Sequence, residues 1–461
     1  MEGAGTIKDL KVKVTYKQIL LIALPITLAI LIPQVNLLTN NIFLGNLSTE
    51  ALGNAGITGV FYLIFAVAGN GLNNSMQSVF SRYAGRGDTG AFKIILAQGM
   101  RISLQLAAAG ILVTWFIAPY IMYRIAAPGS YPQEMSFLKI RILGLPFLYL
   151  FQMGNAFLVS SLNSRYLMIG FICQTFFNIL LDWLLIFGNG GFPKMGFNGA
   201  ALASVISEAI GFAVVFIVLY KTGLQRQYAL LKKYTYDTKK TKEIIKIATP
   251  LILQYVISVG TWLAFFILIE DRGIAAKAIS NTMRNIFGMV GVFVWAFAAT
   301  CNNMVSNLIG QRKEEKVILA ITRIMLLSLG CCAMMCIIVN IFPDKFFGLF
   351  GQDKKFILQG IPVLRVVTTG MLFMSIGNIW LNGVTGTAKT RVNLAIELIA
   401  LILYMTYTWI FMKVNYVSLE MAWTNELVYW TTIFLGSFIY LKSGKWKSSI
   451  IVIPSNEPGR E

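Results

Sequence analysis

The sequence predicts an all-α polytopic membrane protein, with twelve transmembrane helices in two six-helix lobes related by pseudo-two-fold symmetry. Composition is the first indication, because the 461 residues are 56% hydrophobic and only 13% charged, far from an average soluble domain. Apolar runs of about twenty residues, the length that a helix needs to cross a bilayer, recur along the whole chain. Motifs of the first half also return in the second half in the same order.

Twelve apolar runs can be delimited from the hydropathy pattern. In chain order they cover residues 19–43, 56–81, 94–118, 139–161, 167–187, 197–220, 244–269, 279–308, 317–342, 358–382, 392–412 and 419–441. The pattern of an outer-membrane barrel, short strands of alternating apolar and polar residues, is not found in the sequence. We therefore expect helices throughout, with ends placed to within a few residues.

The formal net charge of +19 is explained by the expected topology. If the N-terminus is cytoplasmic, Lys and Arg gather before the first span, in the loops after every second span and in the tail. Cytoplasmic loops of membrane proteins carry this excess. We therefore expect both termini in the cytoplasm, the lipid bilayer as the partner in place of any nucleic acid, and the cytoplasmic membrane of a prokaryote as the location.

The two halves repeat with a shift of about 225 residues. The segment 17–25 resembles 242–250, and Ser81 and Gly85 match Ser306 and Gly310. An even number of spans in each half gives both halves the same orientation, which places a transport site beside their interface. The expected domains are an N-terminal lobe at 1–220, a basic cytoplasmic linker at 221–243, a C-terminal lobe at 244–441 and a cytoplasmic tail at 442–461.

Two polar residues, Asn178 and Asp182, lie inside the apolar run 167–187. They are four residues apart and therefore share one face of a helix. A carboxylate in a membrane span is costly and marks a transport or proton-relay site, unless neighbouring amides satisfy it as a structural acid. The next span opens with the small residues Gly199–Ser204, which let two helices approach closely.

Several activities are disfavoured by what the chain lacks. It has no His, and its five cysteines show no metal-ligand spacing. A zinc site and His-based catalysis are therefore not expected. No P-loop pattern occurs, which disfavours ATP-driven transport. We expect neither enzyme activity nor a cofactor.

Several motifs in one order resemble the multidrug and toxic compound extrusion (MATE) transporters, which belong to a wider flippase superfamily. The motifs are Phe43–Gly53, Ser81–Asp88, Arg141–Phe147, Asn178–Gly188 and Gly199–Ser204. The resemblance covers nearly the whole chain. It implies two lobes around a central cavity, and a monomer that exports organic cations or amphipathic drugs in exchange for protons or sodium ions.

The resemblance also implies a coupling site in the first lobe. Prokaryotic relatives use an Asp on helix 1, an Asn and an Asp on helix 5 and a Thr on helix 6. Asn178 and Asp182 match, Ser204 occupies the Thr position, and the backbone of Ala200 offers a further oxygen. Asn40 occupies the position of the helix 1 acid, so one of the two carboxylates is missing.

One carboxylate with neutral oxygens can still hold sodium, and it can instead hold a proton because burial disfavours its charged form. We expect weaker cation binding than in relatives with both acids, and coupling that depends on Asp182 alone. Pro25 and Pro33 kink helix 1. This kink is either static or a bend that changes with the occupancy of the acidic site, as proposed for relatives.

The second lobe lacks the coupling acid of another branch of the family, because Ser258 stands where that branch has a Glu on helix 7. Glu397 lies in the apolar run 392–412 and is a candidate substrate contact or second proton site. Glu208, one turn beyond Ser204, is another candidate, although a structural pairing suits it better.

Two alternatives keep the fold but change the function. A flippase for a lipid-linked or polar glycan would favour a larger, strongly cationic cavity, and the scattered positions of Arg101, Arg284 and Arg365 argue against it. A non-transporting relative with a decayed ion site is favoured by Asn40 and Ser258.

Overall fold

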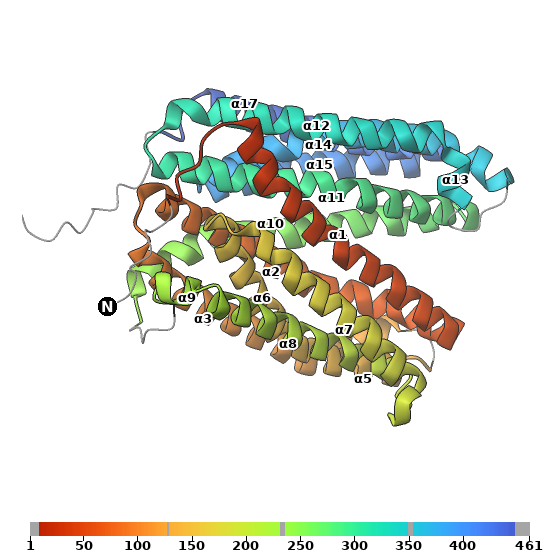
Figure 1. Ribbon diagram of the computed structural model, residues 1–461. Helices are drawn as coiled ribbons and strands as arrows, with labels where there is room; N and C mark the ends of the chain where they lie inside the picture. The colour runs from red at the N-terminus through yellow and green to blue at the C-terminus, as the bar shows by residue number, and fades with distance from the viewer. Residues whose placement is uncertain (1–8, 127–128, 231–235, 349–353, 448–461) are drawn as a thin grey trace, which may run out of the picture.

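The computed structural model describes residues 9–126, 129–230, 236–348 and 354–447. Regular secondary structure in these ranges is entirely helical, and eleven of their helices are long and apolar enough to cross a membrane. The protein is therefore a multi-pass membrane protein. Figure 1 shows two bundles that meet at the end carrying α9 (Leu224–Gln227) and diverge toward the end carrying α5 and α13.

The first bundle contains six spans. They are α1 (Tyr16–Leu47), α2 (Thr49–Arg86), α3 (Gly90–Leu112) continued by a π-helical turn into α4 (Ala118–Ile125), α5 (Tyr131–Arg141) continued into α6 (Leu145–Ser160), α7 (Leu167–Phe187) and α8 (Phe197–Lys221). The third span is longer than the predicted 94–118, because α4 carries the helix on to Ile125. Its only proline, Pro119, lies in the first turn of α4, where the missing N–H costs little.

The second bundle repeats this series. Its helices are α10 (Thr238–Glu270), α11 (Ile274–Gly310), α12 (Val317–Ile341), the short α13 (Pro343–Gly348), α14 (Lys354–Gly386), α15 (Thr390–Trp409), α16 (Leu419–Trp423) and α17 (Asn425–Lys442). Side-chain caps mark several helix starts: Ser48 accepts a hydrogen bond from the Ala51 backbone at 2.9 Å, and Asp237 accepts one from Lys240 at 2.9 Å.

The twelfth predicted span, 419–441, is divided between α16 and α17 at Thr424. The Thr424 hydroxyl donates to the Met421 carbonyl at 2.6 Å, a contact that competes with the helical hydrogen bonds and bends the chain. Asn425 follows, and its side chain donates to Thr408 Oγ1 on α15 at 3.0 Å. Polar contacts to a neighbouring helix therefore outweigh helical continuity at this point.

The two bundles pack their helices in the same way. In the first, α1 packs on α7, α2 on α6, α7 on α8, and α6 on α8. In the second, α10 packs on α15, α11 on α14, α15 on α17, and α14 on α17. Each of these four contacts of the first bundle thus has a counterpart between the equivalent helices of the second, which is the pseudo-two-fold arrangement that the sequence predicts.

The bundles are joined where α2 crosses α11. A Cβ on Gly85 would lie 2.0 Å from the Asn307 carbonyl oxygen, and one on Gly310 would lie 2.1 Å from the Arg82 carbonyl oxygen. Only glycine allows the two backbones to approach this closely. The glycines that the sequence matches between the halves therefore meet at one crossing.

Hydrogen bonds between the bundles gather near this crossing. Ser78 and Ser306 share one between their hydroxyls at 2.9 Å, and Gln77 donates to the Ala299 carbonyl at 2.8 Å. The backbone of Val12, just before α1, donates to Asn307 Oδ1 at 3.1 Å. The bundles are therefore fastened at the end of the molecule where the chain enters α1.

Candidate functional site

The candidate site lies between α1, α7 and α8, close to the end of α7. Helices α7 and α8 approach each other closely there. Gly199 allows this approach, since a Cβ at its position would come within 2.6 Å of the Leu185 carbonyl oxygen. This confirms the close packing expected from the small residues at the start of α8. It brings the polar residues of both helices to one place, with α1 packed against α7.

Asp182 is completely buried in this site, with a relative exposure of 0%. Its Oδ2 atom accepts a hydrogen bond of 2.5 Å from the Asn40 side-chain amide. This holds for the orientation of the Asn40 amide in which its nitrogen faces the surrounding acceptor oxygens. Its Oδ1 atom has no hydrogen-bond partner. A buried carboxylate oxygen without a partner is unfavourable, so this atom is available to a proton or a cation.

Asn40 connects the helices of the site. In the same orientation its amide donates to Asn178 Oδ1 at 3.1 Å and to the Asn36 carbonyl at 3.3 Å. Asn36, one turn earlier on α1, has a buried Oδ1 atom without a partner. The sequence indicates Asn40 but not Asn36. The spacing of four residues, which places Asn36 on the same helix face as Asn40, is a signal that could have identified it.

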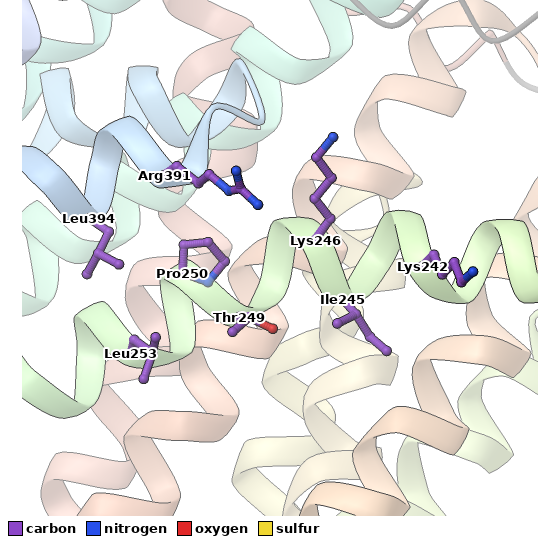
Figure 2. Close-up of a pocket in the computed structure, with 8 residues that line it drawn as sticks. All are labelled: Lys242, Ile245, Lys246, Thr249, Pro250, Leu253, Arg391 and Leu394. Carbon is purple, nitrogen blue, oxygen red and sulfur yellow. The ribbon is translucent and has the colours of Figure 1, made fainter.

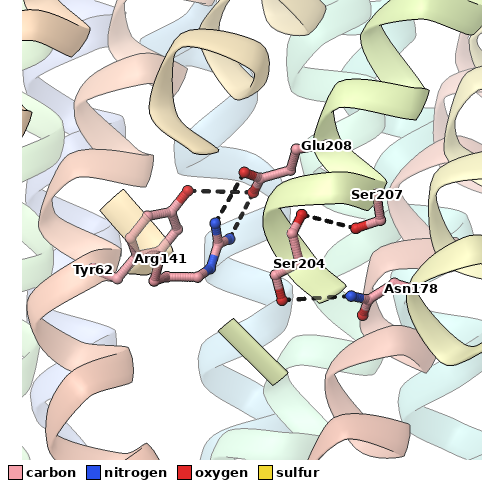
Figure 3. A network of polar contacts seen from close by, with 6 residues as sticks. All are labelled: Tyr62, Arg141, Asn178, Ser204, Ser207 and Glu208. Atoms are coloured by element: carbon pink, nitrogen blue, oxygen red, sulfur yellow. Dashed lines mark hydrogen bonds and ion pairs between the residues drawn. The ribbon is translucent and has the colours of Figure 1, made fainter. Parts of the chain in front are cut away.

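Asn178 and Ser204 complete the polar group. The Asn178 amide donates to Ser204 Oγ at 3.4 Å, and Ser207 donates to the Ser204 carbonyl at 2.9 Å (Figure 3). Ala200, one turn before Ser204, is buried among apolar residues that include Leu44 and Ile186. The structure thus brings Asn40, Asn178, Asp182 and Ser204 together, with Ala200 beside them.

Glu208 forms the structural pairing expected for it, with a partner, Arg141, that the sequence does not identify. Arg141 binds it through two hydrogen bonds of 2.9 and 2.6 Å, and the Tyr62 hydroxyl donates to it at 3.2 Å (Figure 3). The guanidinium lies 3.7 Å from the centre of the Tyr62 ring. A bidentate pair of this kind is a strong, directional contact between two helices, which favours a structural role for Glu208.

The positive charge of Arg141 also acts on the Asp182 carboxylate within the first bundle. Arg141 ends α5 beside the 3-10 turn that leads into α6. An Arg at the start of a predicted membrane span is a signal that could have identified it, since such a residue needs an acidic partner inside the bundle.

Glu397 lies far along the chain, in the second bundle, and is 1% exposed. Tyr429 on α17 donates to its Oε1 atom at 2.5 Å, and Gln254 on α10 donates to its Oε2 atom at 3.4 Å. Ser258, on α10, shares a hydrogen bond of 3.4 Å with Tyr429. Neutral groups therefore surround Glu397, and its site is separate from that of Asp182.

Pro25 and Pro33 both lie inside α1, which continues as one helix from Tyr16 to Leu47. Each proline lacks the N–H that would bond the carbonyl four residues earlier. Asn36 and Asn40 follow on the same helix, so the weakened segment directly precedes the polar group of the site.

The site contains oxygen ligands suited to a small hard cation. In the part of the chain described by the structure, no group of three or more His, Cys, Asp or Glu residues could hold a metal ion, so a transition-metal centre does not explain the cluster. Asp182 Oδ1 and Asn36 Oδ1 are buried and unpartnered. A proton would satisfy the carboxylate oxygen, and a sodium ion would satisfy either oxygen.

Comparisons with known proteins agree with one another. The MatE family model matches residues 25–184 and again 247–410, once in each bundle. The multidrug resistance protein NorM of Thermotoga maritima is 22% identical over 95% of this chain and 94% of its own, and that of Listeria innocua is 24% identical over 92% of each. A crystal structure of a MATE in complex with MaD3S superposes with a TM-score of 0.86 at 16% identity, covering 97% of this chain and 100% of that one.

Proposed function

The chain belongs to the MatE family of membrane transporters, and from this premise we propose that it exports cationic or amphipathic organic compounds in exchange for protons or sodium ions. Its relatives are named as multidrug resistance proteins, which supports drugs as the class of substrate. The coupling ion would bind in the first bundle, and the two bundles would move about their crossing to give alternating access.

The observation that carries this proposal is the state of Asp182. Its carboxylate is completely buried in a membrane helix, and one of its oxygens has no partner. An ionised carboxylate in that position is unfavourable unless a cation or a proton joins it. Asn178 and Ser204 lie close enough to supply oxygens to the shell of a cation, with Asn36 as an additional oxygen donor. Asn40 contributes the amide that holds the other carboxylate oxygen of Asp182.

Helix α1 connects this site directly to the interface between the two bundles. Asn36 and Asn40 lie on α1, which packs both on α7 of its own bundle and on α11 of the other bundle. A cation at Asp182 would draw the oxygens of α1 toward α7. We propose that the segment weakened by Pro25 and Pro33 bends in response and alters the contact with α11.

The test replaces the carboxylate and measures transport. We expect Asp182→Asn to lose dye efflux driven by an ion gradient in everted membrane vesicles while its amount in the membrane stays normal. Proton and sodium gradients imposed separately identify the coupling ion. Asp271→Asn is the matched control, because Asp271 is 56% exposed and pairs with Lys413 at the surface. Full efflux by Asp182→Asn would disprove the coupling role.

The same vesicles decide between this proposal and a non-transporting relative. Asn40 and Ser258 favour that alternative, since both replace acids that the family uses for coupling. Gradient-driven dye efflux by the unaltered protein excludes it. If the unaltered protein moves no dye under either gradient, the proposed export of organic cations is wrong.

A further inference from the structure

A groove lies between α10 and α15 at the end of the molecule where the bundles are joined. It has a volume of about 460 Å³ and is lined by Lys242, Ile245, Lys246, Thr249, Pro250 and Leu253 of α10 and by Arg391 and Leu394 of α15 (Figure 2). It is remote from Asp182, which lies near the opposite end of α7, and nothing in the proposed coupling uses it.

The groove carries positive charge without a matching acid. Lys242, Lys246 and Arg391 are exposed, and the residues that line the groove include neither Asp nor Glu. In Figure 2 the side chains of Lys246 and Arg391 extend into the same space above Pro250. The nearest carboxylate on α10, Glu243, lies 3.5 Å from Lys240 in an ion pair.

Further positively charged side chains lie close to this groove. Burial and the positive charges of Arg82 and Lys246 lower the pKa of Lys389, the residue just before α15. Arg82 is only 9% exposed, and its Nε atom is buried without a hydrogen-bond partner. Glu243 also acts on Arg82, but one carboxylate does not offset this group of cations. An anion bound at the groove would therefore be stabilised.

The groove changes from basic to apolar along α10. Leu253 lies seven residues beyond Lys246, about 10 Å further along the helix axis. Ile245 is 44% exposed and Leu253 is 47% exposed, as expected for side chains that face lipid. A ligand that matches both parts has an anionic group at the basic end and an apolar chain that runs toward the membrane interior.

We propose that this groove binds an anionic phospholipid, with its phosphate between Lys246 and Arg391 and an acyl chain along Leu253 and Leu394. A free phosphate would use only the basic part. Cytoplasmic leaflets are rich in anionic lipid, which attracts Lys and Arg near the surface, and the expected topology places the groove there. Because the lipid would contact both α10 and α15, it would hold these two helices of the second bundle together.

The test measures lipid binding and needs no transport assay, so its failure is distinct from a failure of the proposed function. The purified full-length protein in a zwitterionic detergent is titrated with phosphatidylglycerol or with phosphatidylcholine of the same acyl chains. Native mass spectrometry counts bound lipid, and the unfolding temperature reports stabilisation. We expect retention and stabilisation by phosphatidylglycerol, with about thirtyfold weaker binding after Lys246→Gln and Arg391→Gln are combined, from about fivefold for each charge.

A matched double variant controls for overall charge. Lys239→Gln with Lys316→Gln removes two exposed cations that do not line the groove, and it should keep the affinity of the unaltered protein. Equal binding of the two lipids, or equal losses in both double variants, would overturn the proposal. Full stabilisation by inorganic phosphate alone would also overturn it and would indicate a small-anion site.

Discussion

At the scale of single residues, the site is determined by which groups surround Asp182. Asn40 contributes an amide hydrogen-bond donor at 2.5 Å from the carboxylate, where the family pattern has a second acid. A donor satisfies one charged oxygen without adding negative charge. The buried site therefore attracts a cation less strongly than a pair of carboxylates would, because the Coulomb attraction increases with the charge of the site.

Asn40→Asp tests this account of the site. The new carboxylate would lie within hydrogen-bond distance of Asp182, where two negative charges cannot both remain without a shared proton or cation. We expect the cation to bind at least about tenfold more tightly, because a close buried charge contributes more than 1.4 kcal/mol at an intermediate dielectric constant. The measurement is the unfolding temperature of the purified protein as a function of sodium concentration and of pH.

The control for this prediction is Asn415→Asp, the same change of an amide to an acid at an exposed loop position. It should leave the ion dependence unchanged. If Asn40→Asp shows the same dependence on both ions as the unaltered protein, the polar group around Asp182 does not bind a cation.

The sequence identifies some residues of this site and misses others for a physical reason. Asn178 and Asp182 can be recognised because a four-residue spacing in an apolar run places them on one helix face. Arg141 escapes notice because its partner, Glu208, lies 67 residues away on another helix. Spacing within one helix is visible in a sequence, whereas a contact between helices depends on how they pack.

At the scale of elements, the crossing of α2 and α11 brings a glycine of each bundle against a backbone carbonyl of the other. Sequence comparison of the two halves matches Gly85 with Gly310, but it does not show that these glycines meet. The interruption at Thr424 is also not predicted by the sequence, because the apolar content of 419–441 indicates one continuous span. In both cases the deciding interaction is made with another helix, by the Arg82 and Asn307 carbonyls or by Thr408.

Gly310→Ala tests the importance of the crossing. The added methyl group would lie 2.1 Å from the Arg82 carbonyl oxygen, so the helices must separate. We expect a loss of about 1–3 kcal/mol of stability, as for other overpacked interiors, and reduced dye efflux. The unfolding temperature in detergent and efflux in vesicles provide the measurements. Gly330→Ala on α12 is the control, since its Cβ would meet nothing within 4 Å. Equal stability of both variants would show that the crossing tolerates separation.

At the scale of the whole molecule, two copies of one six-span unit face each other in the same orientation. The family model matches each half once, and equivalent helices make equivalent contacts. Hydropathy is a property of each segment, so the sequence was sufficient to predict the fold class. The joining of the bundles at one end depends on bonds such as that between Ser78 and Ser306, 228 residues apart, which no local pattern reveals.

The orientation of the whole molecule can be tested with two cysteine variants. Thr222 follows α8, and Asn415 lies between α15 and α16; both are exposed. With both termini in the cytoplasm, we expect a membrane-impermeant maleimide to label Asn415→Cys in intact cells and Thr222→Cys only in everted vesicles. The natural cysteines lie within membrane-spanning helices, so the unaltered protein is the control and should stay unlabelled in both preparations. The reverse pattern would invert the topology and would place the basic end of the bundles, with its groove, outside the cell, in conflict with the tendency of Lys and Arg to remain on the cytoplasmic side.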